Sequence, residues 1–287
     1  MNGTGDLISL ALLEDLGAAG DVTSQAFITA EATSRARIVS RCDCIASGIA
    51  TAVEVFRRID PSLSIIVRSA EGDLLAPGSV LLEISGPTRS ILSGERTALN
   101  FLGRLCGIAT LSRRFADAVR GTKAVLLDTR KTTPGWRLLE KAAVKAGGCT
   151  NHRMGLHDAV LVKDNHLAAL GDLALLPPVI TRLRAEHPGL PIEIEADTLD
   201  QVEALLVMKG IDVILLDNMS TAQITEAVAR RNNLAPAVLL EASGGVTLAT
   251  VAGIAATGVD RISVGALTHS ATNADLSLEM ESPGHVR

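Results

Sequence analysis

The sequence predicts an α/β protein, with an N-terminal α/β sandwich followed by an incomplete α/β barrel of about six parallel strands. Three observations predict this class. Short apolar runs recur through the second half of the chain, and each ends in a charged, hydroxylic or glycine residue. Helical patterns separate most of these runs. The first third of the chain instead carries alternating, strand-like segments that are punctuated by turns.

The apolar runs are continuous and rich in leucine and β-branched residues, as expected for strands buried on both faces of a parallel sheet. A repeated order of strand and helix is typical of an α/β barrel or a doubly wound sheet. Six strands are fewer than the eight of a closed barrel, so we expect an incomplete one. The runs are residues 125–127, 159–162, 192–194, 213–216, 238–240 and 262–264, and the helical patterns are residues 136–146, 198–209, 219–231 and 247–257.

The N-terminal part begins with a predicted amphipathic helix, and a long helix leads from it to the barrel. Gly103 and Gly107 are expected to be close-packing or kink points of the long helix. The predicted helices are residues 7–16, 50–58 and 93–119, and the strands are residues 37–42, 63–67 and 80–84. We therefore place the N-terminal domain at residues 1–107 and the barrel at residues 108–267. The tail, residues 268–287, can pack back on the first domain.

Composition argues against two kinds of partner. The 287 residues carry a formal charge of −5 and a pI of about 5.7, so a general nucleic-acid surface is not expected. One tryptophan and no tyrosine leave little aromatic surface on which bases could stack. The mean hydropathy is +0.30, yet no apolar stretch reaches the ~18 residues of a membrane span.

The expected location is the cytoplasm. The first 20 residues contain three acidic side chains and no basic one, which argues against secretory and organellar targeting. The four cysteines fit neither a zinc-ribbon spacing nor a disulfide framework, so we expect small, mostly buried thiols in a reducing compartment. They are Cys42, Cys44, Cys106 and Cys149.

Cations are concentrated between residues 129 and 153 of this acidic protein. Lys141 and Lys145 are spaced i,i+4 and are expected on the solvated face of a helix. Arg130 and Lys131 differ from them, because they directly follow a buried strand in a loop of hydroxyls and turn formers. The six basic residues of the segment are Arg130, Lys131, Arg137, Lys141, Lys145 and Arg153, against the single acid Glu140, and His152 is a further candidate cation.

His152, Arg153 and Lys163 flank the next strand in the same way that Arg130 and Lys131 follow theirs. Cations that converge at the mouth of a barrel indicate an anionic ligand. Arginine in particular suits a carboxylate or a phosphate, because its guanidinium offers two parallel donors.

The loops after the last two strands favour a phosphate. Ser243, Gly244 and Gly245 lie between a strand and a predicted helix, where glycines let backbone N–H groups approach an anion. One strand later, Val264-Gly265-Ala266 repeats the arrangement. Phosphate sites built from the two final strand loops recur in such barrels, although a Gly-Gly pair alone can be a tight turn.

Glu195 and Asp217 end strands without a basic residue next to them in sequence. They can be structural ion-pair partners of the cations. Alternatively, they stabilise a positive charge that develops on a substrate, or hold Mg²⁺ against phosphates. No serine or cysteine stands in a nucleophile elbow, so a catalytic nucleophile is not indicated.

These stretches, taken together, resemble the quinolinate phosphoribosyltransferase family, the carboxylating, nicotinate-nucleotide-forming enzymes of NAD biosynthesis. The resemblance runs in order over nearly the whole chain. The matching stretches are residues 14–17 (EDLG), 20–23 (GDVT), 95–102 (ERTALNFL), 107–110 (GIAT), 128–135 (DTRKTTPG), 147–148 (GG), 151–153 (NHR), 163–166 (KDNH), 216–218 (LDN), 241–245 (EASGG) and 263–269 (SVGALTH).

The resemblance implies transfer of a phosphoribosyl group from phosphoribosyl pyrophosphate to quinolinate, with Mg²⁺ and with loss of CO₂. It implies binding of quinolinate carboxylates and phosphates by Arg96, Thr129, Arg130, Lys131, His152, Arg153 and Lys163. It places Glu195 and Asp217 near the ribose and the metal, which they reach through substrate phosphates or water. Residues 243–245 and 264–266 become phosphate loops, and His269 a further site residue. Lys131, Lys163, Glu195 and Asp217 are the expected catalytic residues.

The resemblance also implies a homodimer at least, with a hexamer as the larger alternative, and active sites that Arg96 completes from the neighbouring subunit. Other functions remain open at this point. One is a related phosphoribosyltransferase-like protein associated with molybdenum transport, and another is a Schiff-base lyase that uses Lys131 or Lys163 on a phosphorylated substrate. A non-catalytic anion-binding module is the third, although a binder has no need for both carboxylates.

Overall fold

The computed structural model describes residues 3–281, which form two compact units. The first unit comprises residues 3–113, 132–148 and 267–281, and the second comprises residues 114–131 and 149–266. The sequence analysis drew contiguous domains and so grouped residues 132–148 with the barrel, whereas their contacts place them in the first unit. Within residues 3–281, none of the helices combines the length and the apolar character that a membrane span requires.

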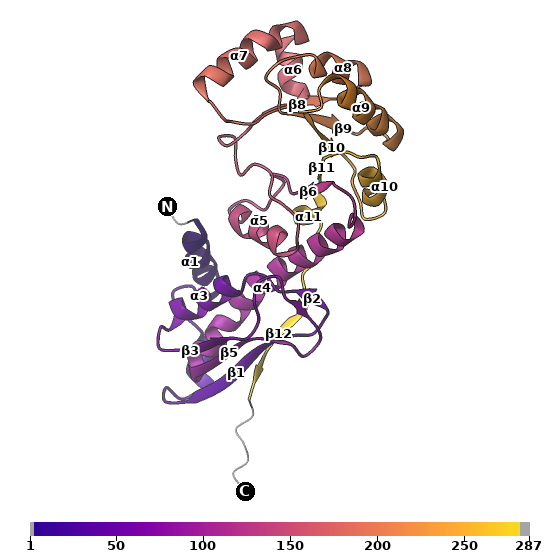
Figure 1. Cartoon of the computed structure of the whole chain (residues 1–287). Helices are drawn as coiled ribbons and strands as arrows, with labels where there is room; N and C mark the ends of the chain where they lie inside the picture. The colour runs from indigo at the N-terminus through magenta and orange to yellow at the C-terminus, as the bar shows by residue number, and fades with distance from the viewer. Residues whose placement is uncertain (1–2, 282–287) are drawn as a thin grey trace. The chain divides into compact units, whose positions relative to one another are not determined.

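The sheet of the first unit is antiparallel, with its four strands in the order β12-β1-β5-β3 (Figure 1). β12 comes from the tail of the chain and pairs with β1 over five residues, from Ala36–Met280 to Ser40–Leu276. Two further strands, β2 and β4, form a small separate ribbon. The strands are β1 (Thr33–Ser40), β2 (Cys44–Ile45), β3 (Ser64–Val67), β4 (Leu74–Leu75), β5 (Val80–Pro87) and β12 (Leu276–Met280).

The core of the first unit lies between this sheet and two of its helices. Phe56 on α3 and Phe101 on α4 are among its largest fully buried side chains, packed with Ile38 and Leu82 from the sheet. The long helix α4 is continuous and runs on into the second unit. The helices are α1 (Gly3–Leu16), α2 (Val22–Phe27), α3 (Ile49–Ile59), α4 (Thr88–Ala118) and α5 (Arg137–Ala146).

Gly103 and Gly107 are close-packing positions on α4, and the helix does not break at either of them. The tail runs directly against this side of the helix, since the backbone N–H of Ala274 donates to the carbonyl of Gly103 at 2.9 Å. A Cβ atom on Gly107 would lie 2.0 Å from the carbonyl oxygen of Thr272. Glycine is therefore required here so that two backbones can approach each other.

The helix α5 was expected to be the first helix of the barrel, but it belongs to the first unit because its apolar side packs on the core of that unit. Trp136, at its N-cap, stacks on Phe101 with the ring centroids 4.6 Å apart. Lys141 is completely buried, so its expected place on a solvated helix face is wrong. Lys145, one turn further on, is exposed as expected.

The sheet of the second unit contains the six predicted strands, all parallel, in the order β6-β11-β10-β9-β8-β7 (Figure 1). β6 and β7 are its edges in the described structure, so the barrel is open, as the count of strands predicted. Thr150 forms a single parallel bridge to Leu127 on the free side of β6. The strands are β6 (Val125–Leu127), β7 (Val160–Val162), β8 (Ile192–Ala196), β9 (Val213–Asp217), β10 (Leu239–Ser243) and β11 (Arg261–Ser263).

Helices connect these strands, and most were predicted within a few residues. Capping boxes start α8 at Thr198 and α9 at Ser220, each closed by a glutamine three residues later. The segment between β7 and β8 holds helices that the sequence analysis did not predict. The helices and short turns are α6 (Asp164–Leu170), η1 (Leu173–Leu175), α7 (Leu176–Glu186), α8 (Leu199–Leu206), α9 (Thr221–Leu234), α10 (Val251–Ala256) and α11 (Ala266–His269).

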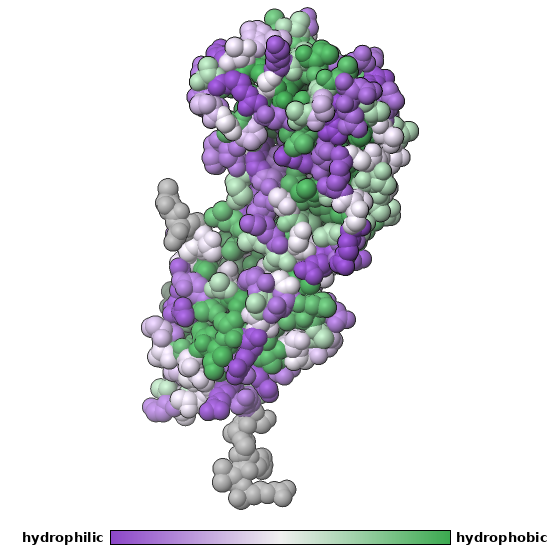
Figure 2. All heavy atoms as spheres, viewed as in Figure 1, coloured by the Kyte–Doolittle hydropathy of each residue, from purple (hydrophilic) through white to green (hydrophobic). Residues whose placement is uncertain are grey.

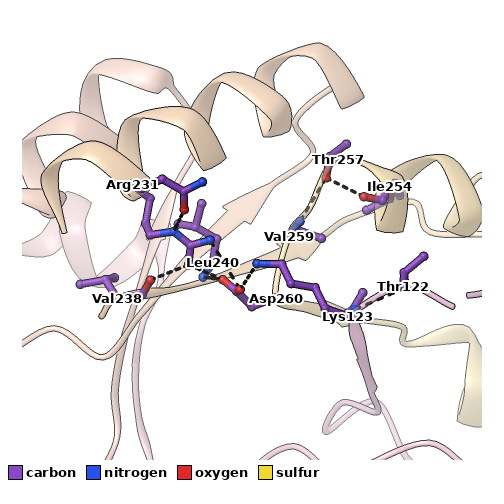
Figure 3. Close-up of polar contacts among 11 residues, drawn as sticks. Thr122, Lys123, Arg231, Val238, Leu240, Ile254, Thr257, Val259 and Asp260 are labelled. Carbon is purple, nitrogen blue, oxygen red and sulfur yellow. Dashed lines mark hydrogen bonds and ion pairs between the residues drawn. The ribbon is translucent and has the colours of Figure 1, made fainter. Parts of the chain in front are cut away.

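A partly buried ion network lies at the N-terminal edge of this sheet (Figure 3). Asp260 accepts hydrogen bonds from the Arg231 guanidinium at 2.6 Å, Lys123 Nζ at 2.7 Å and the Leu240 backbone at 2.9 Å. Burial raises the pKa of Asp260, but the hydrogen bonds, led by that of Arg231, outweigh it and hold the pKa below its usual value. Because Leu240 lies near the start of β10, this network serves the end of the sheet opposite the strand C-termini.

Candidate active site

The C-terminal ends of the parallel strands gather the polar residues that the sequence singled out. Lys163 follows β7, Glu195 lies near the end of β8, and Asp217 and Ser243 end β9 and β10. Asp217 and Ser243 are direct neighbours in the strand register. Parallel strands place their carboxyl ends at one edge of a sheet, and this is where α/β enzymes build their sites.

Glu195 is held in one position at this edge of the sheet by burial and by hydrogen bonds. Its side chain is buried, and its Oε2 accepts a hydrogen bond from Lys163 Nζ at 2.7 Å. The backbone N–H of Asp164 donates to the other oxygen at 3.3 Å. The structural ion-pair role that was weighed for Glu195 is therefore present, and the pair also presents its lysine at the strand edge.

Asp217 stands beside Glu195 and completes a group of carboxylates. Burial, followed by the charge of Glu195, raises the pKa of Asp217 above its ordinary value. One ligand atom each from Glu195, Asp217 and the exposed Asp197 lie within 4.8 Å of one another. Three hard oxygen donors fit a magnesium ion that also binds substrate phosphates. Asp197 was missed because it follows the strand end by one residue and was read as loop.

The loops after β9 and β10 are packed tightly against each other. Asn218 adopts a left-handed backbone conformation with φ 54°, and its N–H donates to the Ser243 carbonyl at 2.9 Å. Gly244 has φ 92°, and a Cβ atom on it would lie 2.1 Å from Asn218 Oδ1. Gly245 also has positive φ, but a Cβ atom there meets nothing within 4 Å. Gly244 is thus required by packing, whereas the space beside Gly245 is open.

The helix predicted to follow these glycines begins later than expected. The pattern placed it at residues 247–257, whereas α10 spans Val251–Ala256 and residues 248–250 form a turn. After β11, the predicted loop of residues 264–266 does lead directly into the short helix α11. The backbone of Val264 is tied to the sheet, since its N–H donates to the Leu127 carbonyl at 2.8 Å.

Inside the sheet, His152 meets two carboxylates that the sequence analysis missed. Its Nε2 lies 3.1 Å from Glu193 Oε2 and 3.3 Å from Glu241 Oε1, and both glutamates are buried. Each glutamate precedes a predicted site residue by two positions on its strand, so it shares that residue's face of the sheet. This period of two was the signal that could have identified them.

The cluster holds a proton at neutral pH. Burial lowers the pKa of His152, but the two glutamates outweigh it and raise the pKa to about 9. The Arg153 N–H lies 2.7 Å from Nδ1 and favours a neutral ring, yet one peptide donor is weaker than two buried carboxylates. Burial, with the charge of Glu241, likewise raises the pKa of Glu193. His152 is therefore the cation that the sequence suggested.

Arg130 and Arg153 lie near enough to each other for their positive charges to repel. Burial, followed by the charge of Arg130, lowers the pKa of Arg153. Buried Asp128 fixes the two segments, because its Oδ1 accepts from the His152 backbone at 2.8 Å and its N–H donates to Thr150. Two guanidiniums held near each other favour an anion between them.

The remaining predicted residues are placed as follows. The Thr129 hydroxyl accepts a hydrogen bond from the Lys131 backbone at 3.1 Å and so shapes its own loop. Arg96, on α4, and His269, on α11, belong to the first unit, and Arg96 is exposed. His269 Nδ1 is 2.8 Å from the Ser270 hydroxyl. All other predicted site residues lie in the second unit.

Comparison with known proteins agrees with this geometry over both units. Residues 21–106 match the family model "Quinolinate phosphoribosyl transferase, N-terminal domain", and residues 108–279 match that of the C-terminal domain. A nicotinate-nucleotide pyrophosphorylase [carboxylating] of Mycobacterium leprae is 42% identical, over 96% of each chain. A probable enzyme of the same name from Bacillus subtilis is 40% identical, over 96% of this chain and 92% of the relative.

A solved structure, the nicotinate-nucleotide pyrophosphorylase of Ehrlichia chaffeensis, superposes with a TM-score of 0.89 at 39% identity. The superposition covers 96% of this chain and 98% of that one. The likeness therefore extends over the antiparallel sheet of the first unit as well as the parallel sheet of the second.

Proposed function

The chain belongs to the quinolinate phosphoribosyl transferase family, and we propose how its residues perform the family reaction. The reaction transfers the phosphoribosyl group of phosphoribosyl pyrophosphate to quinolinate and releases pyrophosphate and CO₂. The product is nicotinate mononucleotide, a precursor of NAD. The proposal rests mainly on one observation: the two carboxylates Glu195 and Asp217 lie beside Lys163, at the same sheet edge as the glycine loops.

The carboxylates act on the ribosyl group. As pyrophosphate leaves, positive charge develops at C1 and the ring oxygen, so negative groups that face the ring lower the barrier. Glu195 is held in its position by Lys163, and Asp217 stands next to it. The protein therefore supplies an electrostatic environment that matches the transition state better than the bound substrate.

The arginines orient quinolinate. Arg130, Arg153 and protonated His152 offer more positive charge than a single carboxylate requires. Two adjacent carboxylates on one pyridine ring match them, and this holds the ring nitrogen toward C1 of the ribose. Once ribosylated, the nitrogen is cationic and stabilises the carbanion that is left at C2 when the neighbouring carboxylate departs as CO₂. A proton from solvent then replaces the carboxylate at C2, and the nitrogen stays cationic in the product.

Magnesium suits the donor set of Glu195, Asp197 and Asp217. Bound there with substrate phosphates, the ion supplies charge neutralisation for the leaving pyrophosphate. The backbone of the loop at Gly244 and Gly245 is shaped to approach a phosphate, because both glycines adopt positive φ angles. Lys131, in the loop that follows β6, adds a cation for the same group.

We propose a homodimer as the smallest active assembly, in which Arg96 completes the site of the neighbouring subunit. Arg96 is exposed on α4. The first unit also exposes large apolar side chains, and Figure 2 shows an apolar area where Figure 1 labels β3 and β5. These exposed apolar side chains include Leu10, Leu13, Val22, Phe27, Ile66 and Val67, from α1, α2 and β3. A second copy of the chain would cover such surface.

The alternatives are less well supported. A Schiff-base lyase needs a neutral lysine in an apolar pocket, whereas Lys163 is 48% exposed and ion-paired with Glu195. The two relatives described above are named nicotinate-nucleotide pyrophosphorylases, which favours quinolinate as the substrate over a role associated with molybdenum transport. For location we keep the cytoplasm as a proposal, since the cysteine spacing fits no disulfide framework.

The test is product formation from quinolinate, phosphoribosyl pyrophosphate and Mg²⁺, with nicotinate as the matched substrate. Nicotinate lacks the second carboxylate, so it leaves part of the arginine cluster without a partner, and kcat/KM should fall by at least about 100-fold. Nicotinate mononucleotide and CO₂ should form in equal amounts from quinolinate. Equal kcat/KM values for the two acids, or no mononucleotide from quinolinate, would contradict the proposal.

A further inference from the structure

Glu140 is a completely buried carboxylate in the first unit, and it binds the loop that follows β6. The backbone N–H of Thr133 donates to its Oε2 at 3.1 Å, and the Thr133 hydroxyl donates to its Oε1 at 2.9 Å. Arg104, on α4, donates to the same Oε1 through Nη2 at 3.0 Å. A buried charge is retained only when it is paired and hydrogen-bonded, and here the Arg104 guanidinium and two groups of Thr133 meet that need.

Arg104 also holds a third segment of the chain. Its Nη1 donates to the carbonyl of Ala271 at 3.0 Å, and Nη2 donates to the carbonyl of Thr268. The planar guanidinium thus spans from a carboxylate to two backbone oxygens, which a lysine cannot do. These contacts fix the segment on both sides of His269, whose Nδ1 lies 2.8 Å from the Ser270 hydroxyl.

The contacts on α5 use the hydroxyls of the loop. Thr132 Oγ1 accepts from Arg137 Nε at 3.0 Å, and the Thr133 hydroxyl is bound to Glu140. Arg137 and Glu140 both lie on α5, so the second half of the loop is fastened to that helix. The first half, with Arg130 and Lys131, extends from this fastening towards β6. The hydroxyls therefore set the position of the loop.

We propose that Arg104 and Glu140 are positioning residues that hold Lys131 and His269 in place for substrate binding. The inference rests on the proposed function, since that function assigns Lys131 and His269 to the substrates. Arg104 and Glu140 touch no reacting atom themselves. They join Thr133 to Thr268 and Ala271 within the first unit. Lys131 lies two residues before Thr133 in the sequence, and His269 directly follows Thr268.

Breaking a purely structural ion pair would also lower the activity of the enzyme, so the test uses a double variant. Arg104→Met alone leaves Glu140 buried without its cation, and the Tm should fall sharply. Arg104→Met with Glu140→Met removes both charges, and an apolar replacement of a buried pair recovers stability. The Tm of the double variant should return towards that of wild type, while kcat/KM stays about 100-fold low, as expected for a loop displaced by about 1 Å.

Trp136 supplies a readout that does not depend on catalysis. It is the only tryptophan, and the chain has no tyrosine. The backbone N–H of Trp136 donates to the Thr133 carbonyl at 3.0 Å. In the double variant without substrate, the emission of Trp136 should shift to the red, because the loop and the start of α5 loosen. Arg68→Met, which breaks an exposed ion pair with Glu83, is the matched control and should change neither emission nor activity.

Recovery of kcat/KM together with the Tm would overturn the proposal and leave a structural pair only. Unchanged Trp136 emission in the double variant would overturn it too.

If the double variant does not fold, a second variant tests the proposal, because Thr133→Val removes one hydrogen bond to Glu140 and keeps the ion pair. If the Tm is unchanged, a fall of about 3-fold or more in kcat/KM, which corresponds to the free energy of about one hydrogen bond, supports the proposal. A smaller change overturns it. A wild-type protein without activity would refute the proposed function, whereas the Trp136 emission would still show whether Arg104 and Glu140 hold the loop in position.

Discussion

Lys163 and Glu195 form an ion pair across the ends of two neighbouring parallel strands, with Nζ 2.7 Å from Oε2. The glutamate is buried, whereas about half of the lysine side chain is exposed. The pair therefore has a fixed inner partner and an outer partner that solvent or a ligand can reach. Because Asp217 stands next to this pair, the edge of the sheet combines two carboxylates with one lysine, as the proposed transfer of a ribosyl group requires.

Stability should depend on pH through His152. Its folded pKa of about 9 lies above the ordinary 6.5, so its contribution is fully present below pH 6.5 and is lost as the pH rises through 9. The free energy of unfolding should fall by up to about 3 kcal/mol over that range. Urea unfolding at several pH values measures it. Glu241→Gln removes one of the two carboxylates and should flatten the dependence, and an unchanged slope would contradict this assignment.

Arg231 should matter far more for stability than Lys123, although both bind Asp260 (Figure 3). Arg231→Met leaves a largely buried aspartate without its main partner and should cost about 3–5 kcal/mol. Lys123 is 56% exposed, so Lys123→Met should cost at most about 1 kcal/mol. Urea denaturation compares the two variants directly. Equal losses would show that the burial of Arg231 is not what makes the network strong.

Gly244 and Gly245 offer a matched pair of alanine substitutions. Both have positive φ, so either alanine costs about 1 kcal/mol of backbone strain. Only at Gly244 does the new Cβ atom collide with Asn218, and Asn218 is bonded to Asp217. Gly244→Ala should therefore raise the KM for phosphoribosyl pyrophosphate about 10-fold or more, on the order expected for displaced binding groups, and Gly245→Ala much less. Steady-state kinetics of both variants will decide, and equal effects would refute a packing role.

Shared active sites predict complementation between two inactive variants. Arg96→Ala and Lys131→Ala should each be nearly inactive alone. If subunits pair at random after co-refolding, half of the dimers are mixed, and each mixed dimer has one intact site. Activity should then return to about a quarter of wild type. A mixture as inactive as its components, with exchange confirmed, would place Arg96 in its own chain's site or outside any site.

The sequence predicted the second unit well because buried parallel strands are continuous apolar runs, such as residues 213–216, which need no knowledge of their partners. It did not predict α6 and α7, because short polar segments and the adjacent Pro177 and Pro178 hide a helix start. The tail was expected on the first domain, but its pairing as β12 with β1 was not predicted, since β1 lies more than 200 residues earlier and pairing over such a distance leaves no local pattern.

Candidate site residues were identified from the sequence where polar residues end strands, and the buried glutamates were overlooked because they lie inside strands. Glu195 and Asp217 stand out because polar residues interrupt an apolar run. Glu193 and Glu241 lie within strands and look like alternation, and only the position of His152 between them reveals a buried charge cluster. Lys141 was misplaced because i,i+4 spacing of lysines does not say which face of a helix packs inward.

The most direct test of the account is the split between turnover and binding in Glu195→Gln and Asp217→Asn. If these carboxylates stabilise the ribosyl cation, kcat should fall by about 100-fold or more in each variant, while the Kd for quinolinate changes less than about 3-fold. Glu203→Gln, an exposed residue paired with Arg230, is the control and should keep normal turnover. Near-normal kcat in both carboxylate variants would make Glu195 and Asp217 structural ion-pair partners and would contradict the proposed mechanism.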